Sequence, residues 1–216
     1  MKKTKLFFLI SLVFSISSCS QAPKNGYYRG YEIPSYNVTK KVGDVEFRVY
    51  QPQLIAEVEV AGDRKEAARK GFLILANYIF GENISAEKIS MTSPVTQKEI
   101  AEKSEKISMT SPVNQIAIAE KKWLIQFKMP QKYDLQTLPK AKDERIKFKN
   151  VAERKTVSIT FSGSWSDKKF SEKKHELEKF IKENNLKTKG EITLAYYDDP
   201  FTLPWNRRNE VIQEIK

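Results

Sequence analysis

The sequence has only one cysteine, Cys19, and one histidine, His175, among its 216 residues. With a single cysteine the chain cannot form an internal disulfide, so its folded part must be stabilised by a packed hydrophobic core. A zinc site needs several cysteine or histidine ligands, and a catalytic triad needs an imidazole oriented by a third group. His175 instead falls on the solvent side of a predicted helix, between Lys174 and Glu176. The sequence therefore predicts neither a zinc site nor a histidine-based nucleophilic site.

Glycine is scarce as well. Its eight residues are scattered singly, and no glycine-rich phosphate-binding loop is present. The 27 acidic residues always allow some carboxylate pair, but no pair is singled out by its neighbours. Together these absences predict that the protein is not an enzyme.

The formal net charge is +11, and most of it comes from lysines interleaved with glutamates. Binding of nucleic acid favours clusters of lysine and arginine with exposed aromatic residues on one face. We therefore expect no nucleic-acid partner. A solvated lysine-rich surface close to anionic lipid headgroups accounts for the charge.

The N-terminus has the pattern of an export signal. Three lysines within the first five residues precede an apolar run over residues 6–16, which is too short to span a bilayer as a helix but fits a secretory signal peptide. The segment Ile16-Ser17-Ser18-Cys19 resembles a bacterial lipobox. We predict a signal peptide over residues 1–18, lipidation of Cys19, a tether over residues 19–30 and an exported lipoprotein anchored to the cell envelope, at the outer membrane or the periplasmic face. An ordinary signal peptide with a chance cysteine is the alternative.

The remainder, residues 31–216, has the pattern of one α+β domain. Alternating apolar residues predict strands, whereas residues 64–80 and 167–184 have helical periodicity. In both halves a strand ends in a small residue and a glycine, and an amphipathic helix and further strands follow. This order predicts two β-α-β-β repeats that form an antiparallel sheet with two helices. The predicted strands cover residues 45–50, 54–60, 123–129, 146–151, 156–162, 191–197 and 210–215.

The two predicted helices differ in their apolar surface. The second has one apolar stripe and a charged back, as expected for a helix lying on a sheet. The first is apolar almost all round, so it must be covered on more than one side, either by a loop of the same domain or by a ligand or partner. Its two neighbouring stripes are Ala68, Phe72, Leu75 and Ile79, and Leu73, Ala76 and Phe80 with Arg69 at the edge.

Three segments, ISMTSPV, GFLILANYIFG and YYDDPFTLPWNRRNEV, resemble the SOUL heme-binding proteins. The resemblance runs over residues 31–215. It implies a distorted antiparallel β-barrel or sheet built from two β-α-β-β repeats with two flanking helices, in agreement with the duplication found above.

The resemblance also implies a ligand, which is heme or another tetrapyrrole held in an apolar groove beside the first helix. By position it makes Arg69 a partner for a propionate, and it makes Phe72, Leu73 and Ala76 the apolar lining. Two further site positions, Asn77 and Leu203, stand where relatives can have lysine. Met91 or Met109 could ligate iron through a thioether, but no histidine lies in this region, so we expect hydrophobic capture without a strong protein ligand. We expect a monomer.

Two other functions are consistent with the same sequence. The duplicated architecture also resembles effector-binding domains of bacterial regulators, which would bind another small apolar ligand or a protein partner. An enzyme acting on a lipid or pigment would need a carboxylate with a perturbed pKa in the cleft.

The nonapeptide EKISMTSPV occurs twice, at residues 87–95 and 105–113, within an 18-residue unit that repeats with 13 identical positions. Its alternation predicts a half-buried strand in each copy, and the two strands are expected to pair as a hairpin. Alternatively, one copy fills the strand of the family fold and the other forms a loop.

Overall fold

The computed structural model describes residues 26–85 and 104–216. Within these residues the chain forms a nine-stranded antiparallel sheet, two small two-stranded sheets and two α-helices. The predicted α+β fold is therefore confirmed, as a sheet that is not closed into a barrel. The helices are α1 (Arg64–Ile79), α2 (Asp167–Glu183) and a short 3-10 helix η1 (Pro204–Asn206). The strands of the large sheet are β3 (Tyr36–Val42), β4 (Val45–Tyr50), β5 (Gln53–Ala61), β7 (Val113–Ala119), β8 (Lys122–Lys128), β10 (Lys147–Val151), β11 (Arg154–Phe161), β12 (Thr188–Tyr196) and β13 (Asn209–Ile215). The small sheets pair β1 (Tyr27–Tyr28) with β2 (Tyr31–Glu32), and β6 (Asn83–Ile84) with β9 (Lys140–Ala141).

Two β-α-β-β units make up most of the large sheet. The first contains β5, α1, β7 and β8, and the second contains β11, α2, β12 and β13. The strand order is β10-β5-β8-β7-β12-β13-β11-β4-β3, so the two units meet where β7 pairs with β12. The strand before each unit, β4 or β10, pairs with the first strand of the other unit. The duplication predicted from the sequence is thus present in the topology.

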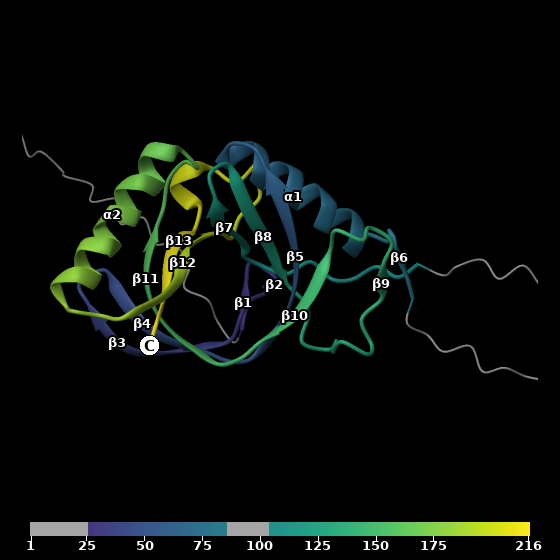
Figure 1. The fold of residues 1–216 in the computed structure, drawn as a ribbon, viewed down its shortest axis with the longest axis horizontal. Helices are drawn as coiled ribbons and strands as arrows, with labels where there is room; N and C mark the ends of the chain where they lie inside the picture. Colours follow the sequence, from purple (N-terminus) through teal and green to yellow (C-terminus); the bar gives the residue numbers. More distant parts are fainter. Residues whose placement is uncertain (1–25, 86–103) are drawn as a thin grey trace, which may run out of the picture.

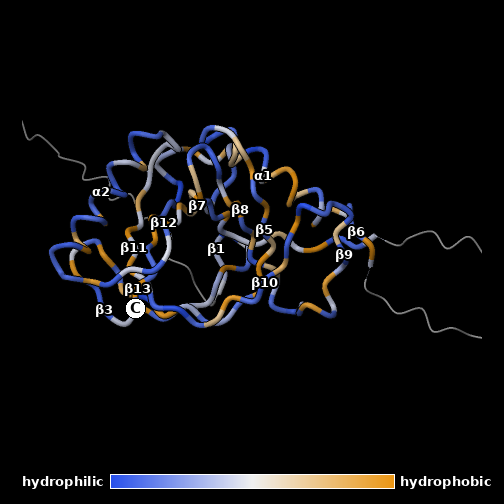
Figure 2. Tube along the Cα trace, in the orientation of Figure 1, coloured by the Kyte–Doolittle hydropathy of each residue, from blue (hydrophilic) through white to orange (hydrophobic). Residues whose placement is uncertain are grey.

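Both helices lie on one face of the sheet and diverge from neighbouring N-terminal ends (Figure 1). The helix α2 packs on β11 and β13, and it is mostly hydrophilic with short hydrophobic segments (Figure 2). Its own Phe170 and Leu177 are buried against the sheet, and its Phe180 and Ile181 are partly buried in the same cluster. The single apolar stripe predicted for this helix is therefore confirmed.

The helix α1 packs on β5 and β8, and its C-terminal half is covered by its own domain. Ile107, from the loop before β7, is buried in the cluster that contains Leu75 and Ile79. The backbone N–H of Ile107 donates to the carbonyl of Ile79 at 2.7 Å. Over the second half of α1, the additional cover that its apolar surface requires is therefore supplied by a loop of the same domain.

The strand predicted over residues 105–113 is wrong. Apart from an isolated bridge between Thr110 and Glu32 and the start of β7 at Val113, this segment forms no strand. Three consecutive residues, Thr110 to Pro112, are buried, so the side chains do not alternate between a core face and a solvent face. β7 pairs with β8 on one side and β12 on the other. The first copy of the nonapeptide, with Met91, lies outside the described residues.

The face of the sheet opposite the helices carries a buried charge cluster. Val211 of β13 packs under α2, so its neighbour Glu210 points to the opposite face. There the Glu210 carboxylate meets Arg48 and Arg208, and all three side chains are buried. The hairpin of β1 and β2 covers part of this face through Tyr28.

No helix in residues 26–85 or 104–216 is long and apolar enough to cross a membrane. The predicted signal peptide and Cys19 lie outside the described residues.

Candidate ligand-binding site

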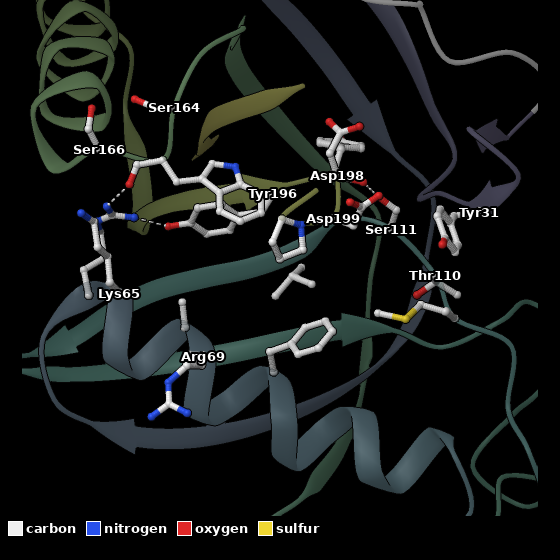
Figure 3. A pocket seen from close by; sticks show the side chains of 18 residues that line it. Tyr31, Lys65, Arg69, Thr110, Ser111, Ser164, Ser166, Tyr196, Asp198 and Asp199 are labelled. Carbon is white, nitrogen blue, oxygen red and sulfur yellow. Dashed lines mark hydrogen bonds between the residues drawn. The ribbon is translucent and has the colours of Figure 1, made fainter. Parts of the chain in front are cut away.

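A cavity of about 630 Å³ lies where the two β-α-β-β units meet. Its wall comes from the first half of α1, the residues leading into β7, the loop before α2, and the end of β12 with the loop that follows. Lys65 and Arg69 project from α1 on one side, and Tyr31 and Thr110 lie at the other end (Figure 3). The lining residues are Tyr31, Arg64, Lys65, Ala68, Arg69, Phe72, Met109, Thr110, Ser111, Val113, Ser164, Trp165, Ser166, Tyr196, Tyr197, Asp198, Asp199 and Pro200.

Arg64, the first residue of α1, ties the two units together at one end of the cavity. Its Nε donates to Oδ1 of Asp167 at 2.6 Å, which joins the N-terminal end of α1 to that of α2. Its Nη1 donates to the hydroxyl of Tyr196 at 2.6 Å, and its Nη2 donates to the carbonyl of Trp165 at 2.8 Å. The hydrogen bond from Arg64 lowers the pKa of the Asp167 carboxyl, so this ion pair is charged at neutral pH.

The phenol of Tyr196 forms a neutral part of the wall. Its hydroxyl donates to Oε1 of the buried Gln115 at 2.7 Å, and Nε2 of Gln115 donates to the carbonyl of Arg64 at 2.7 Å. Burial raises the pKa of Tyr196 to about 12, although the charge of Arg64 opposes that shift. The rings of Trp165 and Tyr196 meet edge to face, with centroids 5.9 Å apart. This end of the cavity is therefore a fixed, largely apolar surface.

At the other end, the buried Asp198 carboxylate is held by an ion pair and hydrogen bonds within the protein. It accepts from the hydroxyl of Tyr28 at 3.2 Å and from the backbone N–H of Arg208, and it pairs with Nε of Arg29 at 3.3 Å. Lys65 and Arg69, by contrast, are exposed at the rim of the cavity, one helical turn apart. Side chains four residues apart lie on the same face of a helix. The site therefore presents two neighbouring cations to a ligand whose body lies against apolar walls.

A model of the SOUL heme-binding protein family matches residues 31–214. The chain belongs to this family. No curated protein sequence matches it significantly. The matched range includes every residue that lines the cavity.

Solved structures share the fold of this SOUL domain at low sequence identity. The C-terminal domain of EcmrR is 8% identical with a TM-score of 0.57, and the match covers 84% of this chain and 98% of that one. A protein described as a hydrolase from Listeria innocua is 14% identical with a TM-score of 0.51, and the match covers 80% of this chain and 92% of that one. At these identities the likeness shows the fold alone.

Of the predicted binding residues on α1, only Arg69 and Phe72 line the cavity of the SOUL domain. Leu73 and Asn77 are exposed outside it, and Ala76 is buried elsewhere in the packing of α1. Lys65, Ala68, Arg69 and Phe72 share the face toward the cavity, and Leu73 and Asn77 turn away from it because one face repeats every three to four residues. Ala76 is on the same face as Phe72, one turn further along, but there it is buried in the C-terminal half of α1, beyond the cavity.

The remaining predicted site residues fall in three places. Leu203 is exposed on the loop between β12 and β13 and does not line the cavity. Met109 does line it, whereas Met91 and Cys19 lie outside the described residues. His175 is exposed on α2, as expected. Among residues 26–85 and 104–216, no group of three or more histidine, cysteine, aspartate or glutamate side chains is placed to hold a metal ion.

Arg64, Trp165 and Tyr196 were not identified from the sequence, although they form one end of the cavity. The sequence did contain a signal for two of them. Arg64 and Trp165 flank the first turns of α1 and α2, at similar places in the two repeats. The two repeats meet where β7 pairs with β12, and the N-terminal ends of α1 and α2 lie together at this junction.

Replacing Arg64 with alanine should lower the free energy of unfolding by about 1–2 kcal/mol. The change removes hydrogen bonds to the Tyr196 hydroxyl and the Trp165 carbonyl in a partly buried setting, and lost bonds of this kind cost about 1 kcal/mol each. Its neighbour Lys65 lies 3.8 Å from Asp167 in an exposed pair, so Lys65→Ala should cost less than about 0.5 kcal/mol. Urea denaturation measures both values. Equal losses in the two variants would show that Arg64 does not tie the units together.

Proposed function

We propose that this chain is an exported, membrane-tethered lipoprotein whose SOUL domain captures heme or a related tetrapyrrole in the cavity beside α1. The family match supports a heme or small-ligand binding module. The observation that carries the proposal for this chain is the cavity itself, in which an apolar wall is combined with two cations on one rim. The lipobox-like segment that ends at Cys19 supports the tether.

The residues that line the cavity fit a tetrapyrrole. Small-molecule sites in proteins range over about 300–1,000 Å³ and are mostly apolar with a few placed polar groups, and a cavity of about 630 Å³ lies within that range. Phe72, Met109 and Trp165 offer apolar surface to a flat ring. Lys65 and Arg69 are placed to form charge-assisted bonds with carboxylates at one edge of that ring.

The proposed function is capture rather than catalysis. The only histidine of the chain, His175, is exposed on α2, so no imidazole reaches the cavity. Bound heme would bring an iron centre, and Met109 is the lining residue with a sulfur atom that could approach it. Most of the binding free energy would then come from burial of the apolar ring.

Hemin titration of the purified protein tests this function. The double variant Lys65→Glu/Arg69→Glu should bind hemin about 10–30-fold more weakly, which corresponds to roughly 1.4–2 kcal/mol, because it replaces both rim cations with carboxylates. The matched control is Lys70→Glu/Lys174→Glu, which makes the same change in net charge at exposed residues outside the lining. The Soret band, followed against hemin concentration, reports binding.

Two outcomes would contradict the proposal. One is a Soret change no larger than that given by an unrelated basic protein. The other is an equal loss of affinity in the control, which would mean that only overall charge attracts hemin. Protoporphyrin, bilirubin and an uncharged apolar ligand complete the series. Thermal stabilisation by all of them alike would favour an effector-binding module without preference for porphyrins.

A further inference from the structure

A cluster of large apolar side chains is exposed beside the cavity. Phe201, Leu203 and Trp205 project from the loop between β12 and η1 and from η1 itself, and Phe201 is 94% exposed. Tyr27 and Tyr31 of the β1–β2 hairpin are exposed as well. These five residues are called the rim surface below. Exposed apolar residues are common when scattered singly, but a group of them marks an interaction site.

The loop that carries Phe201 is held in place by hydrogen bonds, so the exposure of this side chain is built into the fold. The Asp199 carboxylate accepts from the backbone N–H groups of Phe201 and Thr202, at 2.8 Å and 3.0 Å. Arg207 donates to the carbonyl of Thr202 and to that of Pro200, both at 2.7 Å. The Arg207 guanidinium also lies over the Trp165 ring, 4.3 Å from its centroid. The loop is therefore anchored to the cavity wall while its apolar side chains point outward.

The two segments of the rim surface belong to one region of the molecule. Arg29, in the turn of the β1–β2 hairpin, donates through Nη2 to the carbonyl of Asn206 at 2.8 Å and pairs with Asp198. Tyr31 from the hairpin and Pro200 from the loop both line the cavity. The rim surface thus borders the cavity from two sides.

The same region contains the described residue that lies nearest to Cys19 in the sequence. Gly26 is the first described residue, and its carbonyl accepts from the backbone N–H of Ile33 next to the hairpin. Cys19 precedes Gly26 by seven residues, and seven residues span at most roughly 25 Å. A lipid on Cys19 would hold this side of the domain within that distance of the bilayer surface.

We propose that the rim surface lies on the lipid bilayer and that the cavity opens toward it. Tryptophan and tyrosine favour the interface between headgroups and acyl chains, and phenylalanine and leucine favour the acyl boundary. Of the acidic side chains in this region, Asp198 forms an ion pair with Arg29, and Asp199 accepts hydrogen bonds from backbone N–H groups of its own loop. An apolar ligand could then pass between membrane and cavity without crossing water. This inference rests on the proposed tether at Cys19 and does not depend on which ligand is bound.

Quenching of tryptophan fluorescence by brominated lipids tests the proposal. The full chain, produced with its own leader and with the lipid on Cys19 verified by mass spectrometry, is reconstituted into phosphatidylethanolamine/phosphatidylglycerol vesicles. The emission of Trp205 is obtained as the difference between the wild type and Trp205→Phe. We expect brominated acyl chains to reduce this emission at least twofold relative to plain vesicles. The double variant Phe201→Ser/Leu203→Ser should abolish most of that reduction.

The matched control is Leu73→Ser/Phe80→Ser, which removes two exposed apolar side chains, one on α1 and one at its C-cap, both outside the rim surface, and should leave the quenching unchanged. Equal Trp205 emission in brominated and plain vesicles overturns the proposal, and that is also the result expected if the rim surface binds a protein. Quenching that survives Phe201→Ser/Leu203→Ser overturns it too. If mass spectrometry finds no lipid on Cys19, the tether on which the proposal rests is absent and the proposal is overturned. Hemin titration without vesicles tests ligand binding separately. A negative quenching result therefore does not imply that the protein fails to bind hemin, and a negative titration does not imply that the rim surface is off the bilayer.

Discussion

Replacing Glu210 with alanine is expected to lower the free energy of unfolding by about 3–5 kcal/mol. The change leaves the guanidinium groups of Arg48 and Arg208 buried without their carboxylate, and breaking a buried ion pair by removing one partner costs about that much. Urea denaturation at pH 7 measures the loss.

The geometry of this cluster explains why the effect should be large. Arg48 donates to both carboxylate oxygens of Glu210, at 2.9 Å and 3.1 Å, and Arg208 donates to Oε1. The hydroxyls of Tyr197 and Thr160 donate to the same carboxylate at 2.9 Å and 3.0 Å. Every donor comes from a different place in the chain, so the carboxylate joins β4, β11 and the end of β12 to β13.

The pH dependence of stability supplies a second readout of the same variant. Burial opposes ionisation of Glu210, but the charges of Arg48 and Arg208 outweigh it and lower the pKa to about 2 from the ordinary value of 4.5. A carboxyl whose pKa is lowered in the folded state stabilises the protein above the unfolded-state pKa and loses that contribution as pH falls through the folded-state value. The difference between wild type and Glu210→Ala should therefore be constant above about pH 5 and shrink as pH falls from about 4.5 toward 2.

Glu214→Ala is the matched control, because Glu214 lies four residues further along β13 and pairs with Lys189 at the surface. Exposed pairs contribute about 0–1 kcal/mol, so this variant should remain close to the wild type. A loss in Glu210→Ala as small as that in the control would mean that the cluster does not stabilise the fold.

The sequence predicted most of the strands because their apolar residues alternate. The six residues of β4 were predicted without error, and β5, β8, β10, β11, β12 and β13 within three residues at each end. β3 was missed, since its sequence YNVTKKV has no apolar face and its side chains are mostly exposed. Such an edge strand forms through backbone pairing with β4, for which the sequence carries no periodic signal.

The candidate site was predictable only where one helix supplied it. Arg69 and Phe72 were assigned because the resemblance to the SOUL proteins implies ligand-binding residues on the first helix, whose apolar surface is too wide to be covered by a sheet alone. Trp165 and Tyr196 reach the cavity from the second repeat, and only tertiary packing brings them to α1. The tail motif RRNEV shows a related limit. It belongs to one of the three segments that resemble the family, yet its Arg208 and Glu210 lie in the buried cluster rather than in the lining of the cavity.

Replacing Gly71 with alanine is expected to destabilise the protein by about 2 kcal/mol, and Gly71→Val by about 4 kcal/mol. At an exposed helical position glycine to alanine stabilises by about 1 kcal/mol. At Gly71 a Cβ would stand 2.3 Å from Cγ1 and 2.6 Å from Cβ of Ile125 on β8, and overpacking of this kind costs about 1–3 kcal/mol or more. The sign of the effect is therefore set by the contact with the sheet and not by helix propensity.

Because α1 must lift from β8 to accept these side chains, the face that carries Phe72 and Arg69 should move with it. We expect hemin affinity to fall in the same order as stability, with valine below alanine. Lys70→Ala, the adjacent exposed position, should stay within about 0.5 kcal/mol of the wild type. Combining Gly71→Ala with Ile125→Ala should cost less than the sum of the two single changes by about 1 kcal/mol, because the shorter side chain removes the nearest of the colliding atoms. A rise in stability for Gly71→Ala, as at a solvent-facing site, would contradict this prediction. It would mean that α1 does not pack against Ile125, and that its residues Arg69 and Phe72 do not line the cavity as described.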